Sequence, residues 1–147
     1  MVESTLRKFG FPGTLVADTP HWAVLCRPEQ PALGSLVLVC REPVKALGAV
    51  SADAFAALQP VVAAAERALR DLVGYERINY LMLMMVDPDV HFHVIPRYEG
   101  VRAFNGVQFP DAGWPGPPAL GQAVTPEPAV LAALVSALRD RWPAAGD

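Results

Sequence analysis

Short runs of β-branched and aromatic residues, bounded by Pro or Gly, follow one another in the first forty positions of the chain. They lie at residues 14–17, 22–26 and 35–40. Runs of this length and composition are typical of strands, and the Pro-rich segment RPEQPALG before the third run is typical of a turn. The pattern therefore predicts three strands near the start of the chain.

A long amphipathic helix is predicted next, over residues 52–73. Apolar side chains recur there at spacings of three and four, which gives one core-facing stripe. Ser51 can cap the first turn and Gly74 can end the last one. Pro60 should kink this helix or delay its regular part, because proline lacks the amide hydrogen that a helix interior uses.

The second half of the chain predicts a hairpin, a loop and another helix. Residues 77–86 are apolar on both faces, which predicts a central strand, and Asp87-Pro88 would connect it to the next strand. Pro and Gly are frequent in residues 99–122, which predicts a long loop. The sequence Thr125-Pro126-Glu127 supplies a cap, a first-turn proline and an acid, so we predict a helix over residues 125–142.

Length and composition narrow the classes of protein. The 147 residues are enough for one domain, 1–147, with its core at about 14–98. The chain is 52% hydrophobic and 18% charged, which leaves apolar surface for a partner subunit and favours a homodimer. The net charge of −3 and the absence of a Lys or Arg block argue against binding to polymeric nucleic acid.

Neither a secretion signal nor a membrane span is evident in the sequence. The N-terminal stretch MVESTLRKFG lacks an apolar core, and no run of about eighteen apolar residues occurs. Cys26 and Cys40 lie in apolar segments without the spacing of a zinc site, so we expect two buried free thiols. These features predict a cytoplasmic protein without membrane contact.

The segment DPDVHFHVIPR, residues 87–97, places two of the three histidines in a run that otherwise predicts a buried strand. Alternate side chains of a strand share a face. One face then carries Asp89, His91, His93 and Ile95, and the other carries Val90, Phe92 and Val94. The second set is apolar core that the helix over 52–73 would cover, so the histidines belong to a face where a ligand could bind.

Three interpretations of this histidine pair are compatible with the pattern. The imidazoles could be half-exposed groups that hydrogen-bond to backbone or water. They could bind a metal ion, with Asp89, Asp87 or His21 as a third ligand. They could also perform nucleophilic catalysis at phosphorus, in which one imidazole attacks and its neighbour orients groups or supplies a proton.

The string VHFHVIPRY, with the strand LGSLVLVC and a long helix before it, resembles the histidine triad family of nucleotide hydrolases and transferases. That family carries His-φ-His-φ-His-φ-φ, where φ is apolar. Asp89 occupies the first His position here, and His91 and His93 occupy the second and third. The similarity spans about residues 22–98 and is nearest to the fragile histidine triad branch, whose members hydrolyse dinucleoside polyphosphates.

The resemblance implies an α+β, two-layer fold with a five-stranded antiparallel sheet and two main helices, and a homodimer with a continuous ten-stranded sheet. It implies that His91 attacks the α-phosphate of a nucleotide to form a nucleotidyl-histidine, which water hydrolyses or an acceptor takes over. His93 would orient the site through hydrogen bonds. No cofactor is required for this chemistry, although a divalent metal such as Mg²⁺ could accompany the nucleotide.

Several positions depart from the family pattern. The carboxylate of Asp89 would repel a polyphosphate, or it could hydrogen-bond an imidazole and raise its basicity. The phosphate-contacting loop before the triad is missing. At the place of the acid or amide that binds ribose hydroxyls stand Cys26 and Arg27, and neither can accept both hydroxyls. These losses favour an alternative function, a nucleotide-binding domain with weakened catalysis. A second alternative is a small metalloenzyme built on the same histidines.

Other residues could compensate for the missing contacts. Arg41, Lys45 and Arg97 lie near the ends of strands that would border the site, and arginine forms bidentate bonds to phosphate. Ser35 stands where many family members have a histidine. Tyr98 and Trp114 could stack on a base, although core or interface packing explains these aromatic residues equally well. We therefore include Arg97, Ser35, Arg41, Lys45 and Tyr98 as candidate substrate-binding residues.

Overall fold

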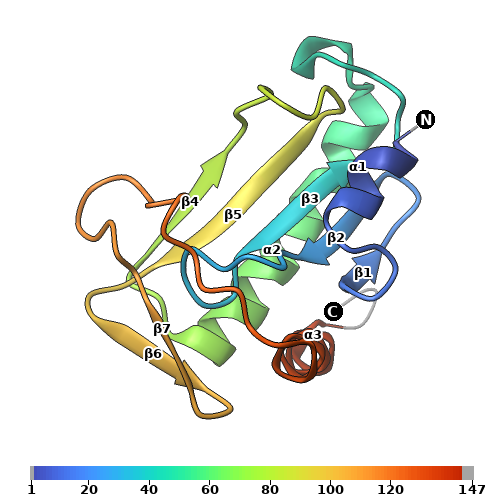
Figure 1. Ribbon diagram of the computed structural model, residues 1–147. Helices are drawn as coiled ribbons and strands as arrows, with labels where there is room; N and C mark the ends of the chain where they lie inside the picture. The colour runs from blue at the N-terminus through green and yellow to red at the C-terminus, as the bar shows by residue number, and fades with distance from the viewer. Residues whose placement is uncertain (1, 144–147) are drawn as a thin grey trace.

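An antiparallel sheet with helices on both of its faces forms the body of the computed structural model, which describes residues 2–143 (Figure 1). Residues 1 and 144–147 of the predicted domain lie outside the described residues. The sheet has the strand order β1-β2-β3-β5-β4. Its strands are β1 (Leu15–Asp18), β2 (Trp22–Cys26), β3 (Leu36–Cys40), β4 (Arg77–Leu81) and β5 (His91–Arg97). The three strands predicted near the start of the chain are therefore confirmed as β1 to β3.

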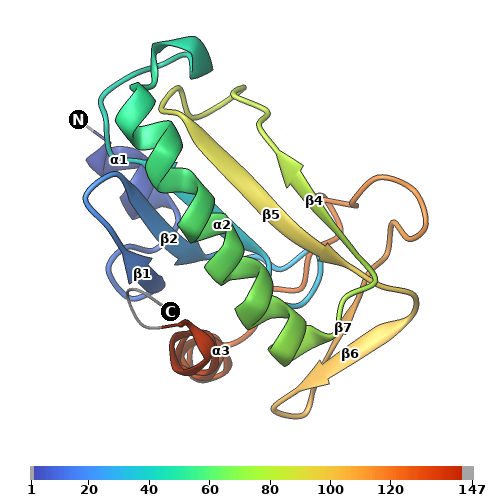
Figure 2. The ribbon, with the colours of Figure 1, turned by 180° about the vertical axis from the view of Figure 1, so that it is seen from behind.

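Helix α2 (Ala52–Val73) has the predicted bounds and covers one face of the sheet, after a short 3₁₀ turn at Leu47–Ala49 (Figure 2). The Ser51 hydroxyl accepts a hydrogen bond from the Ala54 amide at 3.1 Å, and Gly74 ends the helix in a left-handed conformation with φ 64°. The helix continues through Pro60, so the predicted delay of its regular part does not occur. Packing of its buried stripe against the sheet outweighs the one backbone hydrogen bond that Pro60 cannot donate.

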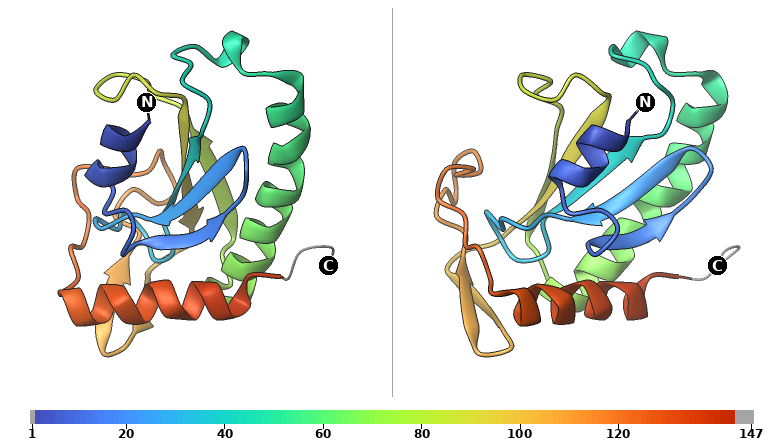
Figure 3. Two further views of the ribbon diagram at one scale, coloured as in Figure 1. Left: turned by 90° about the vertical axis from the view of Figure 1, so that its right-hand side faces the viewer. Right: turned by 45° about the vertical axis from the view of Figure 1, so that its right-hand side comes forward.

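Helix α1 (Glu3–Lys8) covers part of the opposite face of the sheet and is absent from the sequence prediction (Figure 3). Val2, Leu6 and Phe9 of this segment form a small apolar cluster with Val37 and Val39 of β3 and with two residues of β2. Their spacing of four and three positions is the signal that could have indicated the helix. The face that was expected to be open is therefore partly closed by the N-terminus of the same chain.

Strand β4 is an edge strand, which corrects the prediction of a central strand over residues 77–86. It ends at Leu81, and only β5 pairs with it, antiparallel to it as a hairpin requires. The remaining apolar residues enter the loop to β5, where Leu83, Met85 and Val86 are 49%, 85% and 79% exposed. Apolar residues on both faces of the run suggested burial, but more of them lie in this loop than in the strand.

The segment 99–122, predicted as a loop, contains a second, two-stranded sheet. Strands β6 (Val101–Phe104) and β7 (Val107–Pro110) form a hairpin. Its turn residues Asn105 and Gly106 both have positive φ, 47° and 76°, as the tight turns of two-residue hairpins require. The Asn-Gly pair is the sequence signal for this hairpin, and the high Pro and Gly content around it obscured that signal.

Helix α3 (Pro128–Arg141) crosses the end of the sheet and packs against α2 and β1 (Figure 3). It begins three residues later than predicted, with Glu127 at the cap position and Pro128 in the first turn. The second X-Pro pair of the segment therefore starts the helix, because proline is favoured at the first helical position. Both cysteines are buried free thiols, as expected. Among residues 2–143, no helix has the length and apolarity that crossing a membrane requires.

Candidate functional site

The two histidines of β5 lie side by side on one face of the sheet, as strand alternation predicted. Val39 is the cross-strand partner of His91, and Val37 is the partner of His93, so both rings lie on the face that α1 covers. Phe92 between them points to the opposite face, where its ring lies 6.0 Å from that of Trp22. The centroids of the two imidazoles are 5.1 Å apart, and the rings are nearly perpendicular.

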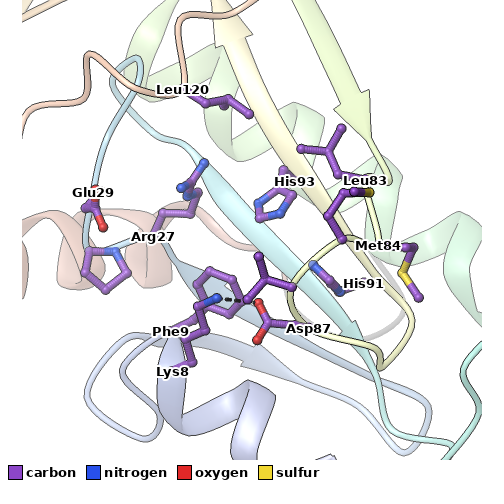
Figure 4. Close-up of a pocket in the computed structure, with 13 residues that line it drawn as sticks. Lys8, Phe9, Arg27, Glu29, Leu83, Met84, Asp87, His91, His93 and Leu120 are labelled. Carbon is purple, nitrogen blue, oxygen red and sulfur yellow. Dashed lines mark hydrogen bonds and ion pairs between the residues drawn. The ribbon is translucent and has the colours of Figure 1, made fainter.

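A cavity of about 320 Å³ lies over this histidine pair (Figure 4). The end of α1, the turn after β2, the loop between β4 and β5, and the loop before α3 all contribute to its wall. His91 and His93 are only 3% and 8% exposed, so a small part of each ring reaches the cavity. Phe9 limits access further, since its ring lies 5.8 Å from that of His93 and 6.1 Å from that of His91.

The backbone fixes the tautomer of His91. Its Nδ1 atom lies 2.6 Å from the carbonyl oxygen of Asp89. Because a carbonyl oxygen can only accept a hydrogen bond, Nδ1 of the neutral ring must carry the proton, and the lone pair resides on Nε2. His91 therefore has the tautomer that a nucleophile or general base at Nε2 requires.

His93 is held in its neutral form. Burial lowers its pKa to about 4, and the nearby charge of Arg27 contributes to the decrease. Its Nδ1 atom is buried and has no hydrogen-bond partner among residues 2–143. A buried ring nitrogen without a partner is costly in a folded protein, and this one belongs to a ring that lines a cavity.

We predict that the ring protons of His93 titrate with a midpoint near pH 4 in NMR spectra of the folded protein. The unfolded chain takes up this proton near pH 6.5, so between these values it binds more protons than the folded state. The free energy of unfolding should therefore fall as the pH is lowered from about 6.5 to about 4. Arg27→Gln should raise the midpoint, because it removes a positive charge; a midpoint near 6.5 in the unchanged protein would contradict the prediction.

The carboxylate of Asp89 does not contact an imidazole, which corrects one of the roles considered for it. It accepts hydrogen bonds from the Thr5 hydroxyl at 2.6 Å and from Lys45 Nζ at 3.1 Å, and the residue is 2% exposed. Burial acts to raise the pKa of Asp89, but the Thr5 and Lys45 interactions outweigh it and leave the pKa below its usual value. Asp89 thus joins α1 to the start of β5, and only its carbonyl oxygen reaches His91.

Three of the candidate substrate-binding residues are buried away from the cavity. Arg97 donates to both carboxylate oxygens of Asp111 at 2.8 and 3.0 Å, and also to Asn79 and to the carbonyl of Gly116. The Ser35 hydroxyl donates to the carbonyl of Ala32, and the Tyr98 hydroxyl donates to that of Phe109. The polar groups of these three residues hydrogen-bond to neighbouring loops, and none of the three residues lines the cavity at the histidine pair.

The other two candidate cations lie at the surface. Arg41 pairs with Asp18 across the β1–β2 end of the sheet, with Nη2 2.6 Å from the carboxylate. The side chain of Lys45 is 65% exposed, and its ammonium pairs with Asp89. Neither residue lines the cavity. Both residues follow the end of β3, but that end of the strand does not border the cavity.

Three charged residues that line the cavity were not among the predicted site residues. Arg27 and Glu29 enter it from the turn after β2, and Lys8 enters it from the end of α1 (Figure 4). Lys8 donates to Asp87 at 2.7 Å, which links α1 to the loop before β5. Arg27 had been considered only for its inability to accept hydrogen bonds from ribose. A charged residue directly after a buried strand was the available signal.

Among the residues that the structure describes, the metal site considered for the histidine pair has no third ligand. Within residues 2–143, no three His, Cys, Asp or Glu side chains are close enough together to hold a metal ion. Asp89 is engaged by Thr5 and Lys45, and Asp87 is paired with Lys8. The geometry therefore does not support the metalloenzyme interpretation.

Solved structures provide the comparison with known proteins. The chain is similar to a histidine triad protein from Bradyrhizobium japonicum, with 23% identity over 95% of each chain and a TM-score of 0.73. A histidine triad protein from Sinorhizobium meliloti 1021 gives 20% identity over 96% of each chain and a TM-score of 0.75. A zinc-bound histidine triad family protein from Mycobacterium smegmatis gives 15% identity, 95% and 93% coverage, and a TM-score of 0.62.

No family model matches this chain, and no curated protein matches its sequence. The similarity to the solved structures extends over nearly the whole of each chain, and it shows that the chain has the histidine triad fold. The predicted α+β fold, with its five-stranded antiparallel sheet and two main helices, is therefore confirmed.

Proposed function

We propose that the chain is a nucleoside phosphate hydrolase or nucleotidyl transferase in which His91 is the nucleophile. The observation that carries this proposal is the geometry of His91. Its Nδ1–H donates to the Asp89 carbonyl at 2.6 Å, and the ring borders a cavity large enough for a small ligand. An imidazole with a free Nε2 lone pair at such a cavity is suited to attack on phosphorus.

The reaction proceeds in two displacements at one phosphorus atom. In the first, the Nε2 lone pair forms a bond to phosphorus, and the bond to the leaving oxygen breaks; a phosphate leaving group departs as an anion and needs no proton. In the second, water attacks the same phosphorus and loses a proton to the solvent, the N–P bond breaks, and its electrons return to Nε2. A nucleophile other than water in the second step would make the protein a transferase.

His93 and Asp89 support this chemistry in different ways. Neutral His93 lies 5.1 Å from His91, centroid to centroid, and its buried Nδ1 has no partner among the described residues. In the tautomer with the proton on Nδ1, a small rotation of the ring would let this atom donate to a phosphoryl oxygen. Asp89 acts as a positioning residue, because its carbonyl sets the tautomer of His91 while Thr5 and Lys45 fix its carboxylate. A divalent cation such as Mg²⁺ would arrive with the nucleotide, since the mechanism assigns no protein-bound metal.

The test is to trap the covalent intermediate. The protein is mixed with nucleoside phosphates labelled at the α-phosphorus, including a dinucleoside polyphosphate, then quenched at high pH and digested for mass spectrometry. A phosphorus–nitrogen adduct should map to His91 and disappear on treatment with acid. His91→Ala should form no adduct, whereas His21→Ala, which alters the histidine outside the cavity, should form it normally. Turnover without any adduct at His91 would overturn the nucleophile assignment.

A nucleotide-binding domain without turnover is the second candidate, and the position of Asp89 favours it. The residue at the first histidine position of the family motif directs its carboxylate to Thr5 and Lys45, so the cavity has two imidazoles and not three. Saturable nucleotide binding to the unchanged protein, without an adduct and without product, would favour this candidate over the enzyme.

The homodimer and the fragile histidine triad branch remain proposals. The dimer is supported by β4, an edge strand with unpaired backbone groups along one side. It is supported further by the adjacent surface of α2, where Phe55, Leu58 and Val62 border a shallow depression. Continuation of the sheet through β4 would cover both features. The dinucleoside polyphosphate substrates of that branch are among the labelled compounds of the trapping experiment.

A further inference from the structure

Arg27 presents an unpaired guanidinium at the histidine cavity. The residue follows β2 directly and lines the cavity together with His91 and His93. Two of its nitrogens, Nε and Nη1, are buried and have no hydrogen-bond partner within residues 2–143. The Nδ1 atom of His93 is the third buried side-chain atom in this condition. The buried side-chain N and O atoms without a partner among the described residues thus belong to two residues of the same cavity.

The backbone of Arg27 is firmly held, so its position is determined by the fold. Its amide donates to the carbonyl of Ser35 at 3.0 Å. Its carbonyl accepts a hydrogen bond from Nε2 of Gln30 at 2.6 Å. Gln30 is fully buried and uses its other amide atom to accept from Gly34 and Ser35. A buried amide therefore organises the whole turn and fixes the point from which the guanidinium reaches into the cavity.

A guanidinium with two buried nitrogens that lack partners is unfavourable unless something pairs with it. Burial lowers the pKa of Arg27, and the charge of Glu29 only partly opposes this effect. Arginine nevertheless stays charged at neutral pH, and donors of a charged group that are buried without a partner are costly. Other cations of the chain form ion pairs: Lys8, in the same cavity, pairs with Asp87, and the buried Arg97 pairs with Asp111. Arg27 differs from them, because two of its buried nitrogens have no partner among the described residues and it lines the cavity where a ligand would bind.

From this geometry we infer that Arg27 is an anion-binding residue, and that the substrate of the site carries a second anionic group besides the phosphoryl group that His91 attacks. This inference rests on the proposed function for the identity of the first group. Arginine has five donors and no acceptor, and its planar fork matches a phosphate or carboxylate. The Nε and Nη1 atoms of Arg27 are buried, and a rotation of its flexible side chain toward the cavity would let them donate to the anionic group of a ligand.

The cavity limits the size of such a substrate. Its volume of about 320 Å³ lies at the lower end of the range for small-molecule sites. Two anionic groups that contact His91 and Arg27 together must therefore be close to each other, as in a diphosphate or a phosphorylated carboxylic acid. Glu29 lies on the outer side of Arg27 in Figure 4 and would repel a longer anionic chain extending past the guanidinium.

Equilibrium binding of three simple anions tests this inference without requiring turnover. Calorimetry at constant ionic strength would compare inorganic orthophosphate, pyrophosphate and phosphonoacetate. The unchanged protein should bind pyrophosphate or phosphonoacetate, which each carry two anionic groups, about tenfold to a hundredfold more tightly than orthophosphate, which carries one. Preference for pyrophosphate identifies a second phosphate as the group at Arg27, and preference for phosphonoacetate identifies a carboxylate.

The variants separate this inference from the proposed function. Arg27→Gln should lose the preference, Arg27→Lys should keep part of it, and Arg67→Gln, which alters an exposed arginine of α2, should keep all of it. His91→Ala should retain the effect of Arg27, so failure to trap an adduct would leave this result unaffected. Two results would overturn the inference. One is no preference in the unchanged protein, and the other is a preference in folded Arg27→Gln and Arg27→Lys equal to that of the unchanged protein.

Discussion

His91→Ala is expected to reduce kcat by about 10³-fold or more on any nucleoside phosphate that the protein hydrolyses, which corresponds to about 4 kcal/mol of barrier. Without the Nε2 lone pair, the covalent route is closed and water must attack phosphorus directly. His91 contributes mainly to chemistry, so KM should change much less than kcat. Steady-state rates on the panel used for adduct trapping would provide this measurement.

Control variants make the result specific to His91. His21→Ala alters the remaining histidine outside the cavity and should leave kcat within about twofold of the unchanged protein. His91→Gly should regain part of its activity when imidazole is added to the solution, because the added ring can occupy the vacated space and attack in place of the side chain. A loss of less than tenfold in folded His91→Ala would mean that another group is the nucleophile.

The positions of the two histidines could be predicted from the sequence because a strand has only two faces. A period of two places residues 91 and 93 together whatever the exact strand ends, and their pairing with Val39 and Val37 confirms this. Helix α2 could be predicted with equal accuracy, since Ser51 and Gly74 mark its ends chemically. These features depend on local geometry alone.

The substrate-binding residues could not be predicted in the same way, because they depend on long-range packing. Arg97 is the last residue of β5 and Arg27 is the first residue after β2, yet the fold pairs Arg97 with Asp111 and leaves Nε and Nη1 of Arg27 without a partner among the described residues. Nothing near either residue in the sequence distinguishes them. Helix α1 presents the same problem, because it is stable only where β3 provides an apolar surface for it.

Arg97→Ala is expected to destabilise the fold by about 3–5 kcal/mol in urea or thermal unfolding. Arg97 and Asp111 are 4% and 1% exposed at their side chains, and the guanidinium also donates to Asn79 and to the carbonyl of Gly116. Within residues 2–143, the variant leaves the buried Asp111 carboxylate with the Tyr98 amide, at 3.1 Å, as its one remaining donor. It also releases the loop after β7 from β5.

A second Arg–Asp pair of the same chain is the matched control for this effect. Arg41 binds Asp18 through Nε and Nη2 at 2.8 and 2.6 Å, and both side chains are considerably exposed. Water can replace either partner there, so Arg41→Ala should cost only about 0–1 kcal/mol. The double variant Arg97→Met/Asp111→Leu should be more stable than Arg97→Ala, because it removes the unpaired carboxylate. Equal losses for Arg97→Ala and Arg41→Ala would show that burial does not control the strength of these pairs, and the same argument for the cost of an unpaired Arg27 would then fail.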